Sequence, residues 1–222
     1  MTITLIAIVL MLAVFLGWIV SHTINVRPWS PEAGDQAGRD RLPAPFTVPR
    51  AGLIVFLAAI TSLFALTISA YSGRMQMAND WQSVSLPDIL WFNSAMLVGA
   101  SIAFHAAWRA IASGRLAGAR LGLAAGGAAS IVFLFGQWLA WRALAGAGVI
   151  PGGDPAAAFF YFLTGLHGVH VIGGLVAWAR AMTRLVRRSD LAEVRVSVEL
   201  CTIYWHYLLA IWAILFALLL AT

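Results

Sequence analysis

Six runs of mostly apolar residues, each about twenty residues long, dominate this chain of 222 residues. A helix needs about 20 such residues to cross the hydrocarbon core of a bilayer. The sequence therefore predicts an all-α integral membrane protein with six transmembrane helices. The runs cover approximately residues 3–20, 51–71, 89–108, 121–141, 159–178 and 196–220.

The composition supports this class. Hydrophobic residues make up 61% of the chain and charged residues only 10%, which leaves too little polar surface for a soluble domain of this length. Every Lys or Arg position is an arginine, and the formal net charge is +5. We interpret these side chains as loop arginines that meet anionic lipid, and we expect no nucleic-acid surface. The single cysteine, Cys201, excludes an intrachain disulfide.

The connectors between the runs predict the domain organisation. We expect an N-terminal transmembrane helix over residues 1–21, a Pro-rich cytoplasmic connector over 22–50 and a five-helix bundle over 51–222. Five prolines in the first connector argue against a helix there. The first run has no basic residue at its start and no convincing small-residue cleavage site, so we expect a retained helix instead of a cleaved signal peptide.

The placement of the arginines predicts the topology. Twelve of the fourteen lie in the first, third and fifth connectors, and only Arg74 and Arg142 lie in the second and fourth. Cytoplasmic loops of membrane proteins are enriched in basic residues. The odd-numbered connectors are therefore predicted to be cytoplasmic, and both termini lie on the opposite side.

Small residues predict close contacts between helices. Gly118, Gly122 and Gly126 are spaced four residues apart, so they share one helix face, and such faces let two backbones approach closely in lipid. The alternative is that glycine is simply common in membrane helices. A second set lies in the next run, at Gly165, Gly168, Gly173 and Gly174.

Four polar side chains within the last two runs are the candidate functional residues. His167 and His170 lie one turn apart on the same face of run 159–178, and Glu199 and His206 nearly share a face of the last run. Ionisable groups inside a membrane are costly and usually paired or functional. We predict that the four form a buried, hydrogen-bonded structural cluster between the last two helices.

Other uses of these residues are open. Three histidines and a carboxylate are suitable ligands for a metal, and a proton relay is a further possibility. Pairing that holds helices together is the commoner use of intramembrane polar groups. A dihaem arrangement needs two histidines more than a dozen residues apart on each of two helices, and no run supplies such a pair.

The last two runs resemble subunit III of the haem-copper oxidases. GLHGVHVIGG at residues 165–174 is similar to the F-H-G-x-H-V-x-x-G motif of the family's penultimate helix, with Leu166 in place of Phe. Glu199 matches a glutamate at the start of the family's last helix, and Tyr-Trp-His at 204–206 matches the end of an aromatic motif. The resemblance covers about residue 50 to the C-terminus.

Three departures identify the chain as a divergent bacterial member. Ile60 stands where the family has a glutamate, so any role of that carboxylate is absent. Leu209 replaces an aspartate that follows the Trp-His pair. The tryptophans that longer members supply to a lipid cleft from their first two helices have no clear match. The five common helices are preceded here by one extra run.

The resemblance implies a non-catalytic accessory subunit of a bacterial respiratory terminal oxidase, which reduces oxygen with proton translocation. The chain would have no catalytic centre, haem or copper of its own. Those cofactors would belong to its partners, catalytic subunit I and subunit II. It would stabilise the catalytic subunit, hold phospholipid and support proton uptake. It would lie in the inner membrane with both termini on the periplasmic side.

Arg184 is the lipid-binding residue that the resemblance implies. The gap-free match places it at an arginine that contacts a phospholipid head group in the family, and a guanidinium can donate two hydrogen bonds to one phosphate. The alternative is that Arg184 only sets topology, together with Arg180, Arg187 and Arg188.

Two other functions are open. One is an accessory protein of a nitric oxide reductase, where related proteins occur. The other is a small membrane transporter, a class that tends to show broken helices and repeated halves. The runs here are unbroken, and neither half of the chain resembles the other.

Overall fold

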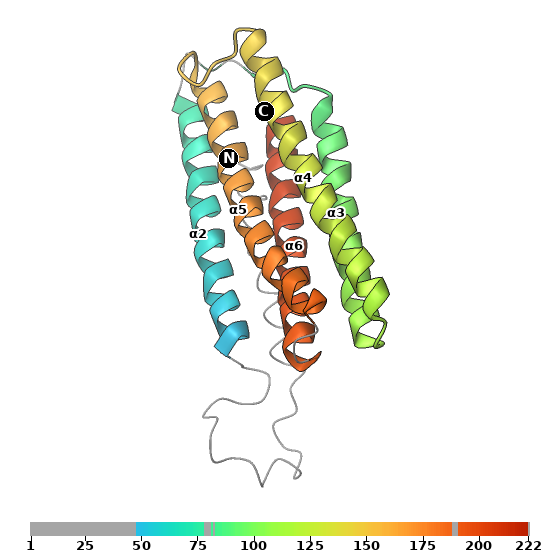
Figure 1. Ribbon diagram of the computed structural model, residues 1–222. Helices are drawn as coiled ribbons and strands as arrows, with labels where there is room; N and C mark the ends of the chain where they lie inside the picture. Colours follow the sequence, from blue (N-terminus) through green and yellow to red (C-terminus); the bar gives the residue numbers. More distant parts are fainter. Residues whose placement is uncertain (1–47, 78–80, 82, 188–190, 222) are drawn as a thin grey trace. The chain divides into compact units, whose positions relative to one another are not determined.

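The computed structural model describes residues 48–77, 81, 83–187 and 191–221, and these residues form five helices without a strand (Figure 1). All five are long and apolar enough to cross a membrane. The chain is therefore an all-α membrane protein. The predicted helix over 1–21 and nearly all of the 22–50 connector lie outside the described residues, so six helices stay a prediction. The helices are α2 (Val48–Met77), α3 (Ile89–Ala112), α4 (Leu116–Gly146), α5 (Pro155–Val186) and α6 (Leu191–Leu220).

The chain divides into two compact units, residues 1–69 and 70–222. In the first unit, two threonines of α2 donate hydrogen bonds within the helix. Thr61 Oγ1 donates to the Leu57 carbonyl at 2.7 Å, and Thr67 Oγ1 donates to the Leu63 carbonyl at 2.8 Å. Ile60, at the position of the family glutamate, is buried.

In the second unit, α3, α4, α5 and α6 form a four-helix bundle. α3 and α5 each pack along both α4 and α6 (Figure 1). α6 has the most enclosed apolar span, with 56% of it buried against 33% for α3. The bundle interior therefore forms largely around α6. Its largest fully buried side chains include Trp205, Phe104, Phe133 and Phe160.

Two indoles of α6 fix the rotation of that helix. Trp205 Nε1 donates to Ser130 Oγ of α4 at 2.8 Å, and Trp212 Nε1 donates to Ser94 Oγ of α3 at 2.9 Å. A buried donor without an acceptor costs about 1–3 kcal/mol. Any rotation of α6 would separate both N–H groups from their acceptors, so the two bonds select one orientation.

α3 and α4 form a tight helical hairpin. Gly114 turns the chain with a φ of 73°, a conformation that costs glycine little. The Arg115 amide then donates to the Ala110 carbonyl at 2.8 Å. Only residues 113–115 separate the two helices, so they are held side by side from this end.

The first glycine set lines the α3–α4 contact, as predicted. A Cβ at Gly122 would lie 2.8 Å from Ala107 Cβ, and one at Gly126 would lie 2.8 Å from the Phe104 ring. At Gly118 the added atom would lie 3.2 Å from Ala110 Cβ. The close-packing interpretation of these glycines is therefore confirmed.

The second glycine set has one member that must be small. A Cβ at Gly174 would lie 2.7 Å from the Tyr204 ring of α6, whereas Gly173 faces open space. Gly165 and Gly168 have only ordinary van der Waals contacts, at 3.6 and 3.8 Å. The prediction for this set holds at Gly174 alone.

α5 begins with a well-formed cap, four residues before the start of the predicted run. One carboxylate oxygen of Asp154 accepts hydrogen bonds from the amides of Ala156 and Ala157, at 2.8 and 3.1 Å. Pro155 occupies the first helical position, where its missing N–H costs nothing. The cap fixes the start of α5, twelve residues before His167.

Candidate functional site

His167 lies at the centre of the bundle, enclosed by aromatic rings. The side chain is fully buried. Its ring centroid lies 5.1 Å from that of Trp212 and 5.7 Å from that of Phe133, which meets it edge-on. Phe133 and Trp212 also contact each other edge-on at 5.0 Å. These apolar surroundings disfavour a charge on the imidazole, so His167 serves as a packing residue between α4, α5 and α6.

His170 lies one turn further along α5 and is half-buried. Its Nδ1 is 2.7 Å from the Leu166 carbonyl oxygen. A carbonyl can only accept, so Nδ1 carries the proton in this bond. The ring is therefore oriented by its own helix.

Tyr204 ties α6 to α5 at the same level. Its hydroxyl donates to the backbone carbonyl of His170 at 2.9 Å. The Tyr204 ring lies over Gly174, where a side chain would collide with it. Gly174 of the GLHGVHVIGG motif and Tyr204 of the Tyr-Trp-His motif therefore contact each other directly.

His206 belongs to a different contact. Its Nδ1 forms a hydrogen bond with Ser101 Oγ of α3, and its ring centroid lies 5.6 Å from that of His105, also of α3. Both histidines are exposed on the surface of the chain. Sequence reasoning did not select His105. The available signal was the spacing of Ser101 and His105, which are four residues apart and so share a helix face.

The four predicted cluster residues therefore have different surroundings. His167 lies among rings of α4 and α6, and His206 contacts α3. Glu199 is half-buried on α6, two turns before His206. A single hydrogen-bonded cluster that joins Glu199 to the histidines stays a prediction. Among the described residues, no group of three or more His, Cys, Asp or Glu side chains is arranged to hold a metal ion, so the metal alternative gains no support.

Arg184 lies near the end of α5 and is held by α6. Its Nη1 donates to Ser197 Oγ at 2.7 Å, and Ser197 Oγ donates to the Glu193 carbonyl at 2.8 Å. This bond uses one of the five guanidinium N–H donors. The Arg184 side chain is exposed, which leaves its charge accessible from outside the chain.

The sequence match to known proteins spans all of these elements. The family model for cytochrome c oxidase subunit III matches residues 45–221, a range that includes all five described helices. The chain belongs to the cytochrome c oxidase subunit III family. This confirms the resemblance drawn from the last two apolar runs.

Individual relatives agree with the family. Cytochrome c oxidase subunit 3 of Thermostichus vulcanus is 31% identical over 172 residues, which cover 76% of this chain and 84% of the relative. The subunit 3 of Synechocystis sp. is 28% identical over 172 residues, covering 75% and 72%. The probable subunit 3 of Mycobacterium tuberculosis is 26% identical over 173 residues, covering 76% and 85%.

In this subunit III-family chain, sequence reasoning also missed a buried pair of amide side chains. Asn93 of α3 and Gln137 of α4 are both buried, and Asn93 Nδ2 donates to Gln137 Oε1 at 3.5 Å. Asn93 Oδ1 occupies the space that a side chain at position 136 would need, so Gly136 is required there. The pair links α3 and α4 at the end of the bundle opposite Gly114.

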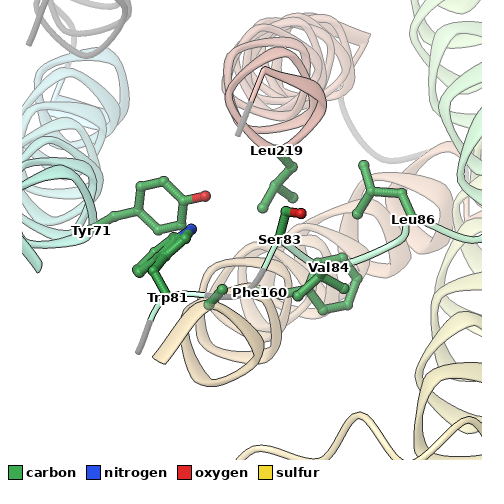
Figure 2. A pocket seen from close by; sticks show the side chains of 8 residues that line it. Tyr71, Trp81, Ser83, Val84, Leu86, Phe160 and Leu219 are labelled. Carbon is green, nitrogen blue, oxygen red and sulfur yellow. The ribbon is translucent and has the colours of Figure 1, made fainter. Parts of the chain in front are cut away.

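A small cavity lies at the end of the bundle where α5 begins. Figure 2 shows Tyr71 and Trp81 on one side of it, with Phe160 and Leu219 nearby. The Tyr71 and Trp81 rings meet edge-on at 5.1 Å. The cavity volume of about 10 Å³ is room for roughly one water molecule. It is too small for a substrate or a cofactor.

Proposed function

We propose that this chain is the non-catalytic subunit III of a bacterial respiratory haem-copper oxidase. The observation that carries the proposal is the family match over residues 45–221. Haem and copper then reside in the catalytic subunit I and in subunit II, which bind this chain in the membrane. The relatives' names, cytochrome c oxidase subunit 3, support this assignment.

The proposed role is to stabilise the catalytic subunit. The four-helix bundle of α3, α4, α5 and α6 is suited to this role. Its interior is closed by aromatic packing around His167 and by the two indole hydrogen bonds of α6. A rigid bundle presents a fixed surface, and a fixed surface loses less entropy when a partner binds.

We propose that Arg184 binds a phospholipid head group. The Ser197 hydroxyl holds Nη1 and so restricts the side chain, and a guanidinium has four further N–H donors with which to meet a phosphate. A planar guanidinium can donate two parallel hydrogen bonds to one phosphate, and this is the geometric reason for an arginine here.

The proposed location is the bacterial inner membrane with both termini on the periplasmic side. The support is the distribution of arginine. Arg109, Arg115 and Arg120 lie in or next to the α3–α4 turn, and five arginines lie between residues 180 and 195, around the α5–α6 connection. The α4–α5 connection holds none, and Arg142 lies near the end of α4. Under this topology Arg184 lies near the cytoplasmic leaflet, where anionic lipid attracts basic groups.

Support of proton uptake is also part of the proposal. Ile60 removes the family's carboxylate from α2, so a carboxylate at that position cannot contribute in this protein. Any support must then act through contact with subunit I and through bound lipid. Proton uptake by the oxidase should therefore depend on retention of this chain.

Purification of the chain in mild detergent tests the proposal. Tagged and expressed with its native partners, the chain should co-purify with a haem-containing subunit, visible by its absorption spectrum and identified by mass spectrometry. Expressed alone, it should be colourless and metal-free. A stoichiometric haem or copper signal in the isolated chain would contradict an accessory role.

A further inference from the structure

Two histidines, His105 of α3 and His206 of α6, lie on the outer surface of the bundle, and His206 is at mid-membrane depth. His206 stands fifteen residues after the start of α6 and fourteen before its end. At 1.5 Å per residue it is roughly 20 Å from either end of the helix. The hydrocarbon core of a bilayer is only about 30 Å thick. Lipid head groups therefore cannot reach this level, and acyl chains offer no hydrogen-bond acceptor.

The two rings are fixed but not fully satisfied. His105 makes ring contacts with Trp108 at 5.5 Å and with His206 at 5.6 Å, and no hydrogen bond reaches its nitrogens from the described residues. His206 bonds to Ser101 through Nδ1 alone. With the serine hydroxyl as donor to Nδ1, the N–H of His206 is on Nε2. Polar groups left unpaired in hydrocarbon are costly, and membrane proteins rarely expose them to lipid.

The helices beneath the rings are locked together. Thr202 Oγ1 of α6, one turn from His206, shares its proton between the Phe104 carbonyl of α3 at 3.1 Å and the Val198 carbonyl of its own helix at 2.9 Å. Trp205 packs on the Phe104 ring, with centroids 4.3 Å apart. The histidines cannot turn inward without breaking these contacts, so their outward position is a property of the folded bundle.

The surface around the pair suits a packed helix. Beyond His206, the outward positions of α6 are Ala213 and Ala217, both exposed. Beside His105, α3 presents Ile102, which is 64% exposed. Small residues let another backbone approach closely in lipid, and polar side chains then hydrogen-bond across the contact. The exposed alanines alone do not indicate what kind of partner binds. The two imidazoles indicate a partner that offers hydrogen-bond acceptors.

We propose that the α3–α6 face around His105 and His206 is the docking surface for a transmembrane helix of another oxidase subunit. This inference rests on the proposed function. The partner helix presents an oxygen acceptor, a carboxylate, hydroxyl or free backbone carbonyl, at mid-membrane depth. That acceptor takes the His206 N–H, and the alanines of α6 let the partner backbone come close.

Photocrosslinking in the assembled complex tests this surface. The crosslinking residue p-benzoylphenylalanine replaces Ile102 or Ala213 on the proposed face, and Val169 or Val176 on the exposed face of α5 as matched controls. After irradiation of native membranes, the first two positions should give adducts with one other oxidase subunit. The α5 positions should give severalfold less of that adduct. This test leaves both histidines unchanged.

A second measurement concerns the histidines themselves. The double variant His105→Leu and His206→Leu should retain the other subunits about three- to tenfold less well in a detergent wash, as expected for one or two lost hydrogen bonds in a membrane. The variant His105→Gln and His206→Gln keeps polar groups and should recover part of the loss. The amount of inserted chain, measured in parallel, separates docking from misfolding.

The outcomes separate this inference from the proposed function. Failure of the unmodified chain to co-purify with any haem-containing subunit would overturn both. Co-purification with crosslinks from α5 alone would overturn only the docking face. The docking face would also be overturned if positions 102 and 213 attach to lipid, to residues 1–47 of this chain or to a second copy of it.

Discussion

Histidine is buried on one side of α6 and exposed on the other. Toward α4 and α5, His167 is fully enclosed by the rings of Trp212 and Phe133. Toward α3, His206 contacts Ser101 and His105, and both imidazoles stay exposed. The first environment is closed off from lipid by rings of the same chain. The second has hydrogen-bonding capacity that hydrocarbon cannot satisfy, and it is completed only by a partner.

The comparison shows that histidines within membrane helices can have different roles, either ring packing or directed hydrogen bonding. His167 contributes shape and ring contacts in apolar, aromatic surroundings. His206 contributes directed hydrogen bonds. Substitutions on the inner side should therefore change the stability of the isolated chain, and substitutions on the outer side should change assembly. The following predictions test that separation in order of expected effect.

The closest contact on the inner side predicts the largest effect. Gly174→Val should destabilise the isolated chain by about 3 kcal/mol or more, because its Cβ would lie 2.7 Å from the Tyr204 ring and 2.9 Å from Trp205. Gly173→Val is the matched control, since nothing lies within 4 Å of an added Cβ there. Thermal unfolding of both variants in the same detergent is the measurement. Equal melting temperatures would show that the α5–α6 contact is not close-packed.

Removal of the enclosed imidazole should have the next largest effect. His167→Ala leaves a cavity among the rings of Phe133 and Trp212 and should cost about 2–4 kcal/mol, the range for large-to-small changes in a core. His105→Ala removes the same side chain from the exposed face of α3 and should change the isolated chain by no more than about 0.5 kcal/mol. A similar loss in both variants would erase the distinction between the two sides.

Substitution of Glu199 tests whether the predicted polar cluster supports assembly of the complex. Removing one member of a buried polar pair leaves the other unsatisfied, at a cost on the order of 1–3 kcal/mol. Glu199→Ala should therefore loosen assembly of the complex, measured as subunit retention in detergent, and Glu199→Gln should be milder. Full retention in the alanine variant would remove Glu199 from any structural cluster.

The indole bond across the bundle predicts a smaller change. Trp205→Phe keeps most of the ring but loses the Nε1–H bond to Ser130, which should cost about 1 kcal/mol. Trp138→Phe is a control on the exposed face of α4, where Trp138 is 45% exposed. The difference between the two melting temperatures combines the lost hydrogen bond with the ring volume removed from the core, since Trp205 is fully buried. No difference would mean that α6 is positioned by ring packing alone.

Much of this architecture could be predicted from the sequence. The length and polarity of the runs predicted the five described helices, because a bilayer allows few alternatives for twenty apolar residues. The family was predicted from the GLHGVH motif and from Glu199 with Tyr-Trp-His, and the match over residues 45–221 confirms it. Spacing by four was enough to place Gly122 and Gly126 on one contact face.

The partners of the polar residues were harder to predict. Helical periodicity says which residues share a face of one helix, but not which neighbouring helix that face meets. His206 and His167 were therefore predicted to share one cluster between the last two helices, whereas His206 contacts α3. Asn93 with Gln137 could not be predicted for the same reason, since 44 residues separate them and neither helix alone indicates the pair.

Arg184 gives the smallest expected effect and lies outside both sides of the comparison, at the end of α5. Arg184→Lys keeps the charge, so topology and general attraction to anionic lipid, worth roughly 1 kcal/mol per basic residue, should survive. A lysine has no planar fork, so a two-pronged contact with a phosphate should weaken. The bond from Nη1 to Ser197 should also be lost, which frees the side chain. Phospholipid retained by the purified Arg184→Lys complex, counted by mass spectrometry, should therefore fall. Arg180→Lys, one turn earlier on α5, is the control and should retain the unmodified amount. Equal lipid in all three complexes would leave Arg184 with a role in topology alone.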